Sequence, residues 1–443
     1  MDRVSKKGIF SWMLFDWAAQ PYHTVLITFI FGPYFASQVA SNAVQGQIIW
    51  GNMISIVGII IAISAPVLGA MADLSGPRKP FIGIFSVFVI VGASFLWFAT
   101  AGGDAPINSI LIAFAIGFIG IEFTAIFTNS MMPSLVPRQE LGKLSGSGWA
   151  LGYIGGIFAL FIVLLLLIAD PITGKNIVGW SPILGLDASQ YEGERATGPL
   201  TAIWYFVFII PLFLFTPDAP KNANKSASLK KALSNLWETI SELPKRTSYF
   251  SFLVTSMIYR DGLNGLFVFG GLYATGVLGM SITQTAIFGI LAGLAGAMGA
   301  FFGGRMDAKF GPKIVVFISC WLLVIAATIV VSLTSNSYFF FIETISSSTP
   351  IIIFYIAGSL LGAAGGSLQA ASRTLLVDQV EKDEATEAFG LYALSGRATS
   401  FLAPWLVAVA TGLSQSQRIG ITPIIALLAL GAFGLIFVKE QKN

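Results

Sequence analysis

The sequence predicts an all-α polytopic membrane protein with twelve transmembrane helices in two pseudo-symmetric bundles of six. Three observations predict this class: an apolar composition, a series of long apolar runs, and similar motifs in the two halves. The chain has 443 residues, of which 55% are hydrophobic and 11% are charged, and its mean hydropathy is +0.80. A soluble domain carries about 25% charged residues. Here the charges gather between the apolar runs, which excludes a soluble multidomain protein.

Each apolar run is long enough to cross the hydrocarbon core, which takes about 20 helical residues. Barrel strands would be about ten residues long and would alternate in polarity. Asp16 and Gln20 interrupt the first run, which also exceeds the roughly 7–15-residue core of a signal peptide, so we expect a retained span. The expected spans are 10–38, 49–71, 80–100, 107–131, 144–169, 199–216, 248–275, 283–304, 314–333, 350–377, 386–411 and 419–438.

The distribution of lysine and arginine predicts that both termini face the cytoplasm. Of the 25 basic residues, 19 lie at the termini or in the even-numbered loops, three lie in the odd-numbered loops and three lie within spans. Basic residues accumulate on the cytoplasmic side of membrane proteins. The net charge of +3 reflects this bias and indicates no nucleic-acid partner. The single cysteine, Cys320, excludes an intrachain disulfide and a Cys-rich metal site.

The longest expected cytoplasmic segment, 217–247, divides the spans six and six. We therefore expect an N-terminal bundle at 1–216, a linker at 217–247 and a C-terminal bundle at 248–443. Within the linker, "SLKKALSNLWETISELPK" places leucine and isoleucine on one helical stripe. This pattern is typical of an amphipathic helix on the membrane surface, and a solvated linker helix fits it as well.

Similar motifs in the two halves indicate an internal repeat. "GAMADLSGPRKPF" follows the second span and "GGRMDAKFGPKIV" follows the eighth, and each has an aspartate, a glycine and a basic residue in that order. The first span carries "FDWAAQPY" and the seventh carries "YRDGLNG", so both opening spans bury an aspartate. Two similar halves are a common plan among secondary transporters.

These motifs carry a resemblance to a known family. The aspartate–glycine–basic loop resembles the signature between helices 2 and 3 of the major facilitator superfamily. "SWMLFDWAAQPY", "GWALGYIGG", "MIYRDGLNG", "QAASRTLL" and "FGLYALSGRATSF" resemble the vacuolar effluxer family, which comprises autophagy-linked vacuolar amino-acid exporters and their bacterial relatives. The resemblance implies a rocker-switch transporter in the bacterial inner membrane, with helices 1, 4, 7 and 10 around its cavity. It does not fix the substrate.

Charged residues inside the spans are the candidate site. A charge at the bilayer centre costs about 2.5–3.5 kcal/mol, so it pairs or lines water. The charged residues well inside the spans are Asp16, Glu122, Arg260, Asp261, Arg373 and Arg397. All except Arg397 lie on helices that the resemblance places around the cavity. We therefore expect them to face an aqueous path.

The adjacent pair in the seventh span suggests separate roles for its two charges. Arg260 and Asp261 are consecutive and therefore point about 100° apart on a helix. We expect Arg260 to approach Glu122 or Asp16 across the cavity, which leaves Asp261 for a proton or a substrate amine. An amino-acid substrate suits this arrangement. The alternative is that the charges only hold helices together through fixed salt bridges.

Neutral polar residues in the same spans have two interpretations. Hydrogen bonds to substrate and interhelix packing bonds both explain Gln20, Asn129, Asn264 and Gln369. Arg373 lies near the cytoplasmic edge, where it either contributes to a gate or extends to the membrane surface. His23, the only histidine, follows Pro21 near an expected helix break and is either a proton relay or a structural residue.

A second set of charges is assigned to gating. By resemblance, Asp73 anchors against a helix N-terminus or Arg138 and holds the cytoplasmic side shut in the outward-open state. A carboxylate at a helix start is favourable by about 0.3–1 kcal/mol, which suits a reversible latch. The full gating set is Asp73, Arg78, Arg138, Asp307 and Arg397. For Arg78, plain positive-inside orientation charge is the favoured explanation.

Small residues at four-residue spacing predict close helix packing in three spans. They are Gly148, Gly152 and Gly156 in the fifth span, Gly289, Gly293, Gly299 and Gly303 in the eighth, and Gly358, Gly362 and Gly366 in the tenth. By resemblance, the fifth and eighth spans lie between the two halves. Tyr153 stands where proton-coupled exporters carry a proline, so export is favoured only weakly.

Together, these observations predict a secondary transporter of small organic solutes, with export of amino acids and proton coupling as the favoured expectation. Drugs, lipids or sugars are the alternative cargo, and a non-transporting sensor or scaffold is the alternative class. The sequence has no G-x-x-x-x-G-K-[ST], HExxH or CxxC motif, so we expect no ATP use, no enzymatic activity, no metal and no cofactor. We expect a monomer in contact with membrane lipid, because each chain encloses its own pathway.

Overall fold

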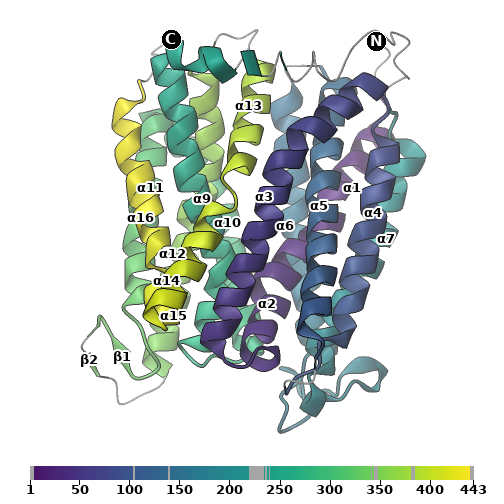
Figure 1. The fold of residues 1–443 in the computed structure, drawn as a ribbon, viewed down its shortest axis with the longest axis vertical. Coiled ribbons are helices and arrows are strands. Elements are labelled where there is room, and N and C mark those ends of the chain that lie inside the picture. Colours follow the sequence, from purple (N-terminus) through teal and green to yellow (C-terminus); the bar gives the residue numbers. More distant parts are fainter. Residues whose placement is uncertain are drawn as a thin grey trace. The chain divides into compact units, whose positions relative to one another are not determined.

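The computed structural model describes residues 4–102, 105–137, 140–218, 234, 237–238, 240–340, 342–343, 348–380 and 385–439. Almost all of the regular structure in these ranges is helical (Figure 1). Ten helices among the described residues are long and apolar enough to span a membrane. The predicted all-α membrane fold is therefore confirmed.

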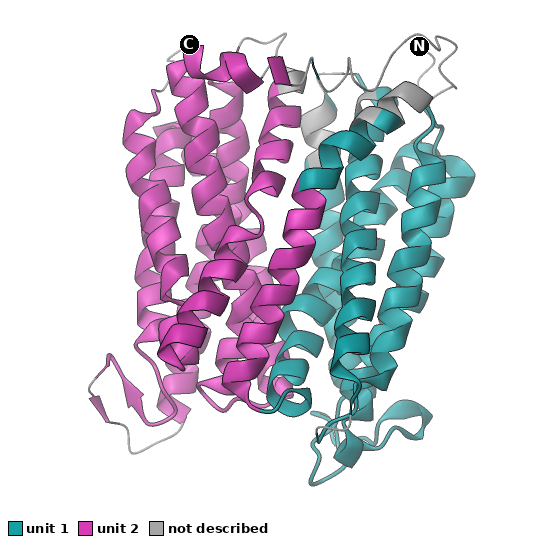
Figure 2. Cartoon of the chain, in the orientation of Figure 1, with its two compact units in different colours: residues 1–41, 63–235 teal, residues 42–62, 236–443 magenta. Residues whose placement is uncertain are grey.

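The chain divides into two compact units (Figure 2). Unit 1 comprises Met1–Ser41 and Ile63–Asn235, and unit 2 comprises Asn42–Ala62 and Leu236–Asn443. The long helix α3 (Ala43–Ser75) is shared, because its first half belongs to unit 2 and its second half to unit 1. The predicted amphipathic linker helix lies mostly outside the described residues.

Unit 1 begins with a helix that changes its winding inside the first span. Helix α1 (Lys6–Pro21) continues as a π-helix, η1 (Tyr22–Phe29), directly after Pro21. Pro21 lacks the N–H that would bond the Trp17 carbonyl oxygen, which accepts a 2.9 Å hydrogen bond from Nε1 of Trp204 instead. The rest of the unit comprises α2 (Phe31–Tyr34), η2 (Phe35–Val39), α4 (Lys79–Phe95), η3 (Leu96–Phe98), α5 (Ile107–Leu135), α6 (Leu141–Ile162), η5 (Val163–Leu167), η6 (Ile183–Gly185), η7 (Ala188–Gln190) and α7 (Glu192–Phe215).

Unit 2 contains most of the remaining helices and one small hairpin. A capping box formed by Ser281 and Gln284 starts α10, and Pro312 occupies the first turn of α11, where it is well tolerated. The elements are η8 (Leu243–Lys245), α9 (Thr247–Gly276), α10 (Ile282–Phe310), α11 (Pro312–Val331), β1 (Ser337–Tyr338), β2 (Ile342–Glu343), α12 (Ser348–Val377), α13 (Ala385–Ala398), α14 (Leu402–Ser414), α15 (Gln417–Gly420), α16 (Thr422–Gly434) and η9 (Leu435–Phe437).

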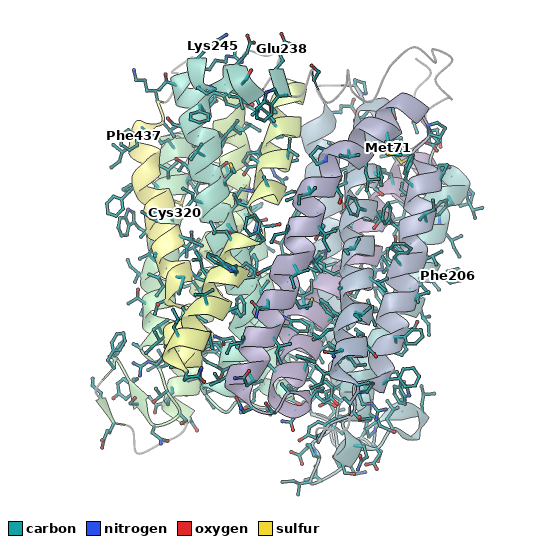
Figure 3. The ribbon with its side chains drawn as sticks, in the orientation of Figure 1. Met71, Phe206, Glu238, Lys245, Cys320 and Phe437 are labelled. Atoms are coloured by element: carbon teal, nitrogen blue, oxygen red, sulfur yellow. The ribbon has the colours of Figure 1, made fainter. Side chains whose placement is uncertain are left out.

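The outer surfaces of both units carry exposed apolar side chains, as lipid contact requires. Phe206 of α7 and Phe437 of η9 project away from their bundles, whereas Cys320 of α11 is fully buried (Figure 3). The ten candidate spans omit the expected first and seventh spans. The first consists of shorter helical pieces, and the seventh, α9, contains two adjacent charges.

The eleventh span is the second departure from a series of continuous helices. It divides into α13, which ends at Ala398, and α14, which begins at Leu402. Pro404 lies in the first turn of α14, where a missing N–H costs nothing, whereas it would break the interior of one continuous helix. The expected span is present, but it contains a helix terminus at membrane depth.

Candidate functional site

The break in the eleventh span places a helix N-terminus beside Asp261. Oδ2 of Asp261 on α9 accepts a hydrogen bond of 2.8 Å from the backbone N–H of Ala403 in the first turn of α14. The Asp261 side chain is deeply buried, with a relative exposure of 1%. Its second oxygen, Oδ1, has no hydrogen-bond partner among the residues that the structure describes.

This contact follows from the chemistry of helix ends. The first four N–H groups of a helix have no partner within the helix, and its N-terminus carries a partial positive charge. A carboxylate accepts a hydrogen bond from one such N–H, and its negative charge compensates the partial positive charge of the N-terminus. Asp261 therefore holds α14 against α9, and Oδ1 remains available for a further donor.

The guanidinium of Arg260 is held by α13. Its Nη1 donates a 2.7 Å hydrogen bond to the carbonyl oxygen of Tyr392, and its Cζ lies 4.0 Å from the centroid of the Tyr392 ring. This cation–π contact is worth about 0.5–2 kcal/mol. Gly396 makes room for the group, because an added Cβ would lie 2.5 Å from Cζ of Arg260. Arg260, Tyr392 and Gly396 all belong to unit 2.

In unit 1, the glycine row of α6 receives α1. A Cβ on Gly148 would collide with Oδ2 of Asp16, and one on Gly156 would lie 2.6 Å from Oγ1 of Thr24. Gln20 donates a 3.1 Å hydrogen bond from Nε2 to that same Oγ1. The packing role predicted for these glycines is confirmed. These glycines contact α1 and η1 of the same unit, where Asp16, Gln20 and Thr24 recur at the matching four-residue spacing.

Each unit thus places a charge of its opening span against a glycine of its fifth span. Asp16 lies against Gly148 in unit 1, and Arg260 lies against Gly396 in unit 2. The two charges have opposite sign. The two halves therefore share the contact between a charged side chain and a glycine, but the charge is negative in unit 1 and positive in unit 2.

The π-helix packs tightly on α5. Tyr22 donates a 2.9 Å hydrogen bond from its hydroxyl to the carbonyl oxygen of Phe114, and the hydroxyl fills the space beside Gly117. His23 follows at the junction, with its ring centroid 6.5 Å from that of Tyr22. Glu122 is buried one turn further along α5. π-helical turns occur frequently at functional sites.

The remaining predicted residues differ in exposure. Asn129 and Asn264 are exposed on α5 and α9, whereas Gln369 and Arg373 are half-buried on α12. Asp307 is buried near the end of α10, and Arg397 is half-buried near the end of α13. The candidate binding residues thus form two subsets, with Asp16, Gln20, Glu122 and Asn129 in unit 1 and Arg260, Asp261, Asn264, Gln369 and Arg373 in unit 2.

The predicted gate of unit 1 involves a residue that sequence reasoning missed. Asp218 follows α7, and its carboxylate accepts hydrogen bonds of 2.8 and 2.9 Å from the N–H groups of Arg78 and Lys79 at the start of α4. Nε of Arg78 also donates to Oγ of Ser130 at 3.1 Å. Arg138 and the side chain of Asp73 lie outside the described residues, as does their predicted contact.

A buried polar cluster in unit 2 was also missed. Gln47 on α3 has an exposure of 0%, and its Nε2 donates to Oγ1 of Thr411 at 2.7 Å and to the carbonyl oxygen of Gln417 at 3.2 Å. Gln417 donates back from Nε2 to the carbonyl oxygen of Ala43 at 2.8 Å. The only signal in the sequence is a glutamine near the start of an apolar run.

Comparison with known proteins relates this architecture to transporters. The model of the vacuole effluxer Atg22-like family matches residues 137–443. A Bacillus subtilis protein, described as the uncharacterized MFS-type transporter YxiO, is 26% identical over 439 residues, which cover 98% of this chain and 95% of YxiO. The multidrug resistance protein MdtG of Klebsiella pneumoniae is 24% identical over 357 residues, with coverages of 78% and 73%. A solved D-xylose–proton symporter is 14% identical with a TM-score of 0.67 over 97% of each chain, which shows a shared fold.

Proposed function

Because the chain belongs to the vacuole effluxer Atg22-like family, we propose that it exports small organic solutes, with amino acids as its substrates and protons as the coupling ion. It is an integral membrane protein and an MFS-type transporter with the twelve-helix major facilitator fold. We place it in a bacterial inner membrane, as a monomer with both termini in the cytoplasm. The positive-inside distribution of its lysines and arginines supports this orientation.

The observation that carries the proposal is the buried contact between Asp261 and α14. A carboxylate with one satisfied and one available oxygen can bind a proton or an ammonium group without unfolding its surroundings. Transporters commonly build their sites from interrupted helices whose ends interact with charge. Asp261 and the break before α14 have this form.

Loading of Asp261 has a direct mechanical consequence. A charge-assisted hydrogen bond is roughly twice as strong as a neutral one, so protonation of Asp261 weakens its bond to the Ala403 N–H. The helix pair α9–α14 then loosens, and the unit can change its packing. Substrate ammonium at Oδ1 keeps the carboxylate ionised and the bond strong. Proton and substrate thus favour different arrangements of the same two helices, which is the requirement for coupling.

The other predicted residues have assigned roles in this scheme. We propose that Asp16, Gln20, Glu122 and Asn129 of unit 1 and Arg260, Asn264, Gln369 and Arg373 of unit 2 contribute to binding of the substrate or the proton. The segments 1–216 and 248–443 are the moving bodies, and 217–247 links them. Arg78, Asp307 and Arg397 contribute to gating. The ionisable residues within spans support these roles, because their cost is acceptable only when they pair or meet water.

Counterflow in proteoliposomes tests the proposal. Vesicles loaded with each unlabelled amino acid should accumulate the labelled form, and an imposed pH gradient should drive net movement. For the Asp261→Asn variant, Glu343→Gln serves as the charge-matched control, because Glu343 is exposed in the short hairpin outside the spans.

Drug export is the second candidate, because MdtG is named a multidrug resistance protein. Counterflow of no amino acid, together with thermal stabilisation by a hydrophobic cation, would select drug export. Neither flux nor stabilisation by any solute would favour a sensor or scaffold.

A further inference from the structure

The loop between η5 and α7, residues 168–191, exposes an unusual number of large apolar side chains. Ile172, Trp180 and Leu184 have exposures of 93%, 63% and 88%. Ile177, Val178 and Ile183 of the same loop are also exposed. In unit 1 this loop lies at the end of the bundle opposite the N-terminus (Figure 1). Contiguous exposed apolar residues in a folded protein mark a surface that another phase or molecule covers.

Hydrogen bonds fix the backbone conformation of this loop. Oδ1 of Asn176 accepts from the N–H groups of Val178 and Trp180 at 3.1 and 2.8 Å, and Nδ2 of Asn176 donates to the carbonyl oxygen of Leu165 in η5. Oδ1 of Asp170 accepts from the N–H groups of the next turn at 2.8 and 3.0 Å. The loop is therefore preformed, and the bond to Leu165 ties it to the end of a membrane span.

The chemistry of the patch fits the interfacial region of a bilayer. Tryptophan is enriched at the membrane–water boundary, and apolar side chains beside a cation are typical of surfaces that lie in the headgroup layer. Lys175 supplies an exposed cation within the loop. Exposed apolar side chains also occur on the adjoining helices, with Phe161 on α6 and Ile203 on α7. The bond from Asn176 to Leu165 attaches the loop to a membrane span, and this attachment favours lipid over a soluble partner as the occupant.

We propose that residues 172–184 form an interfacial anchor. The anchor inserts Ile172, Trp180 and Leu184 into the headgroup region of the leaflet that faces away from the N-terminus, and it fixes the depth of unit 1 in the membrane. This role is independent of the transported substrate.

Site-directed spin labelling in vesicles of phosphatidylethanolamine and phosphatidylglycerol tests the anchor. The only cysteine is buried, so a Cys320→Ala background gives clean labelling. Nitroxides are placed by Ile172→Cys, Trp180→Cys and Leu184→Cys. Gln190→Cys is the control, because Gln190 is an exposed polar residue of the same loop. Collision rates with oxygen, which concentrates in lipid, and with a water-soluble nickel chelate are then compared.

We expect the ratio of oxygen to nickel accessibility to be at least threefold higher at the three apolar positions than at Gln190. Equal, water-like ratios at all four positions would overturn the proposal. Low accessibility to both reagents at the three positions would also overturn it, because a second copy or another protein then covers the patch. Native Trp180 gives an independent readout without a label. Brominated lipids should quench an emission component that Trp180→Phe removes, and an unquenched component would contradict insertion.

Discussion

Replacement of Gly396 by alanine should displace Arg260 and thereby reduce transport. The new Cβ would lie 2.5 Å from Cζ and 2.7 Å from Nη1 of Arg260, so the guanidinium must move away from Tyr392. It then loses the 2.7 Å hydrogen bond to the Tyr392 carbonyl and the stacking at 4.0 Å. A hydrogen bond to a charged group contributes about 1.5–3 kcal/mol, and the cation–π contact contributes about 0.5–2 kcal/mol.

The helix propensity of alanine works in the opposite direction. Alanine is favoured over glycine by about 0.8–1 kcal/mol inside a helix. The net effect of Gly396→Ala is therefore a loss of about 1–4 kcal/mol in the free energy of unfolding. Gly390→Ala is the matched control, because Gly390 lies on the same helix with no atom within 4 Å of its added Cβ. That variant should be unchanged or more stable by up to about 1 kcal/mol.

Unfolding by denaturant in detergent micelles measures both variants, and counterflow measures their activity. We expect Gly396→Ala to be less stable than Gly390→Ala and to lose most of its flux. Arg260→Gln should restore stability to the Gly396→Ala protein, because the collision disappears. Equal stability and equal flux in the two alanine variants would refute the assigned packing of Arg260.

Three further outcomes follow from other contacts. Gly148→Ala should be less stable than Gly146→Ala by about 1–3 kcal/mol in the same denaturant assay. A Cβ at position 148 would collide with Asp16, whereas a Cβ at position 146 has no atom within 4 Å. Equal unfolding free energies would contradict the α1–α6 packing. Gln47→Leu should lower the unfolding free energy by about 1–3 kcal/mol through its lost bonds to Thr411 and Gln417, whereas Gln45→Leu at a half-buried position of the same helix should not. Hydrogen bonds from the N–H groups of Thr173 and Ile172 lower the pKa of Asp170 below its ordinary value of 3.8. A carboxyl group whose pKa is lower in the folded than in the unfolded protein stabilises the fold at pH values above its ordinary pKa, and this stabilisation is lost as the pH falls through the folded-state pKa. A nitroxide attached at Ile177→Cys should therefore stay immobile from pH 8 to 5 and become mobile only in stronger acid. Asp170→Ala, which has no side-chain acceptor, should show the mobile signal throughout.

Hydropathy sufficed to predict the spans because the bilayer imposes a length on each apolar run. The interruptions within spans were harder to predict. Pro404 signalled that a helix begins just before it, but continuous hydropathy concealed that signal. Pro21 marked the junction in the first span, although its outcome is a π-helix rather than a break. Both cases show that proline carries boundary information that an apolar average removes.

The site was predictable in its residues but not in their partners. Charges within spans identify Asp261 and Arg260, since burial of a charge is costly. Their contacts are to a backbone N–H 142 residues away and to a carbonyl oxygen 132 residues away. Backbone groups look identical in every sequence, so no pattern could indicate them. Asp218 and Gln47 were missed for a similar reason, because each is a single polar residue without a repeated motif.

The most direct test of the transport mechanism is Asp261→Asn in proteoliposomes, with counterflow and gradient-driven flux measured on the same preparation. Asparagine retains a side-chain oxygen that can accept from the Ala403 N–H, so the protein should still fold, with a weaker, neutral hydrogen bond at this position. It cannot bind and release a proton at physiological pH. We predict that net flux driven by a pH gradient is abolished in Asp261→Asn, while the variant still shows a folded melting transition. Gradient-driven flux equal to that of the unmodified protein would show that Asp261 is only a helix cap.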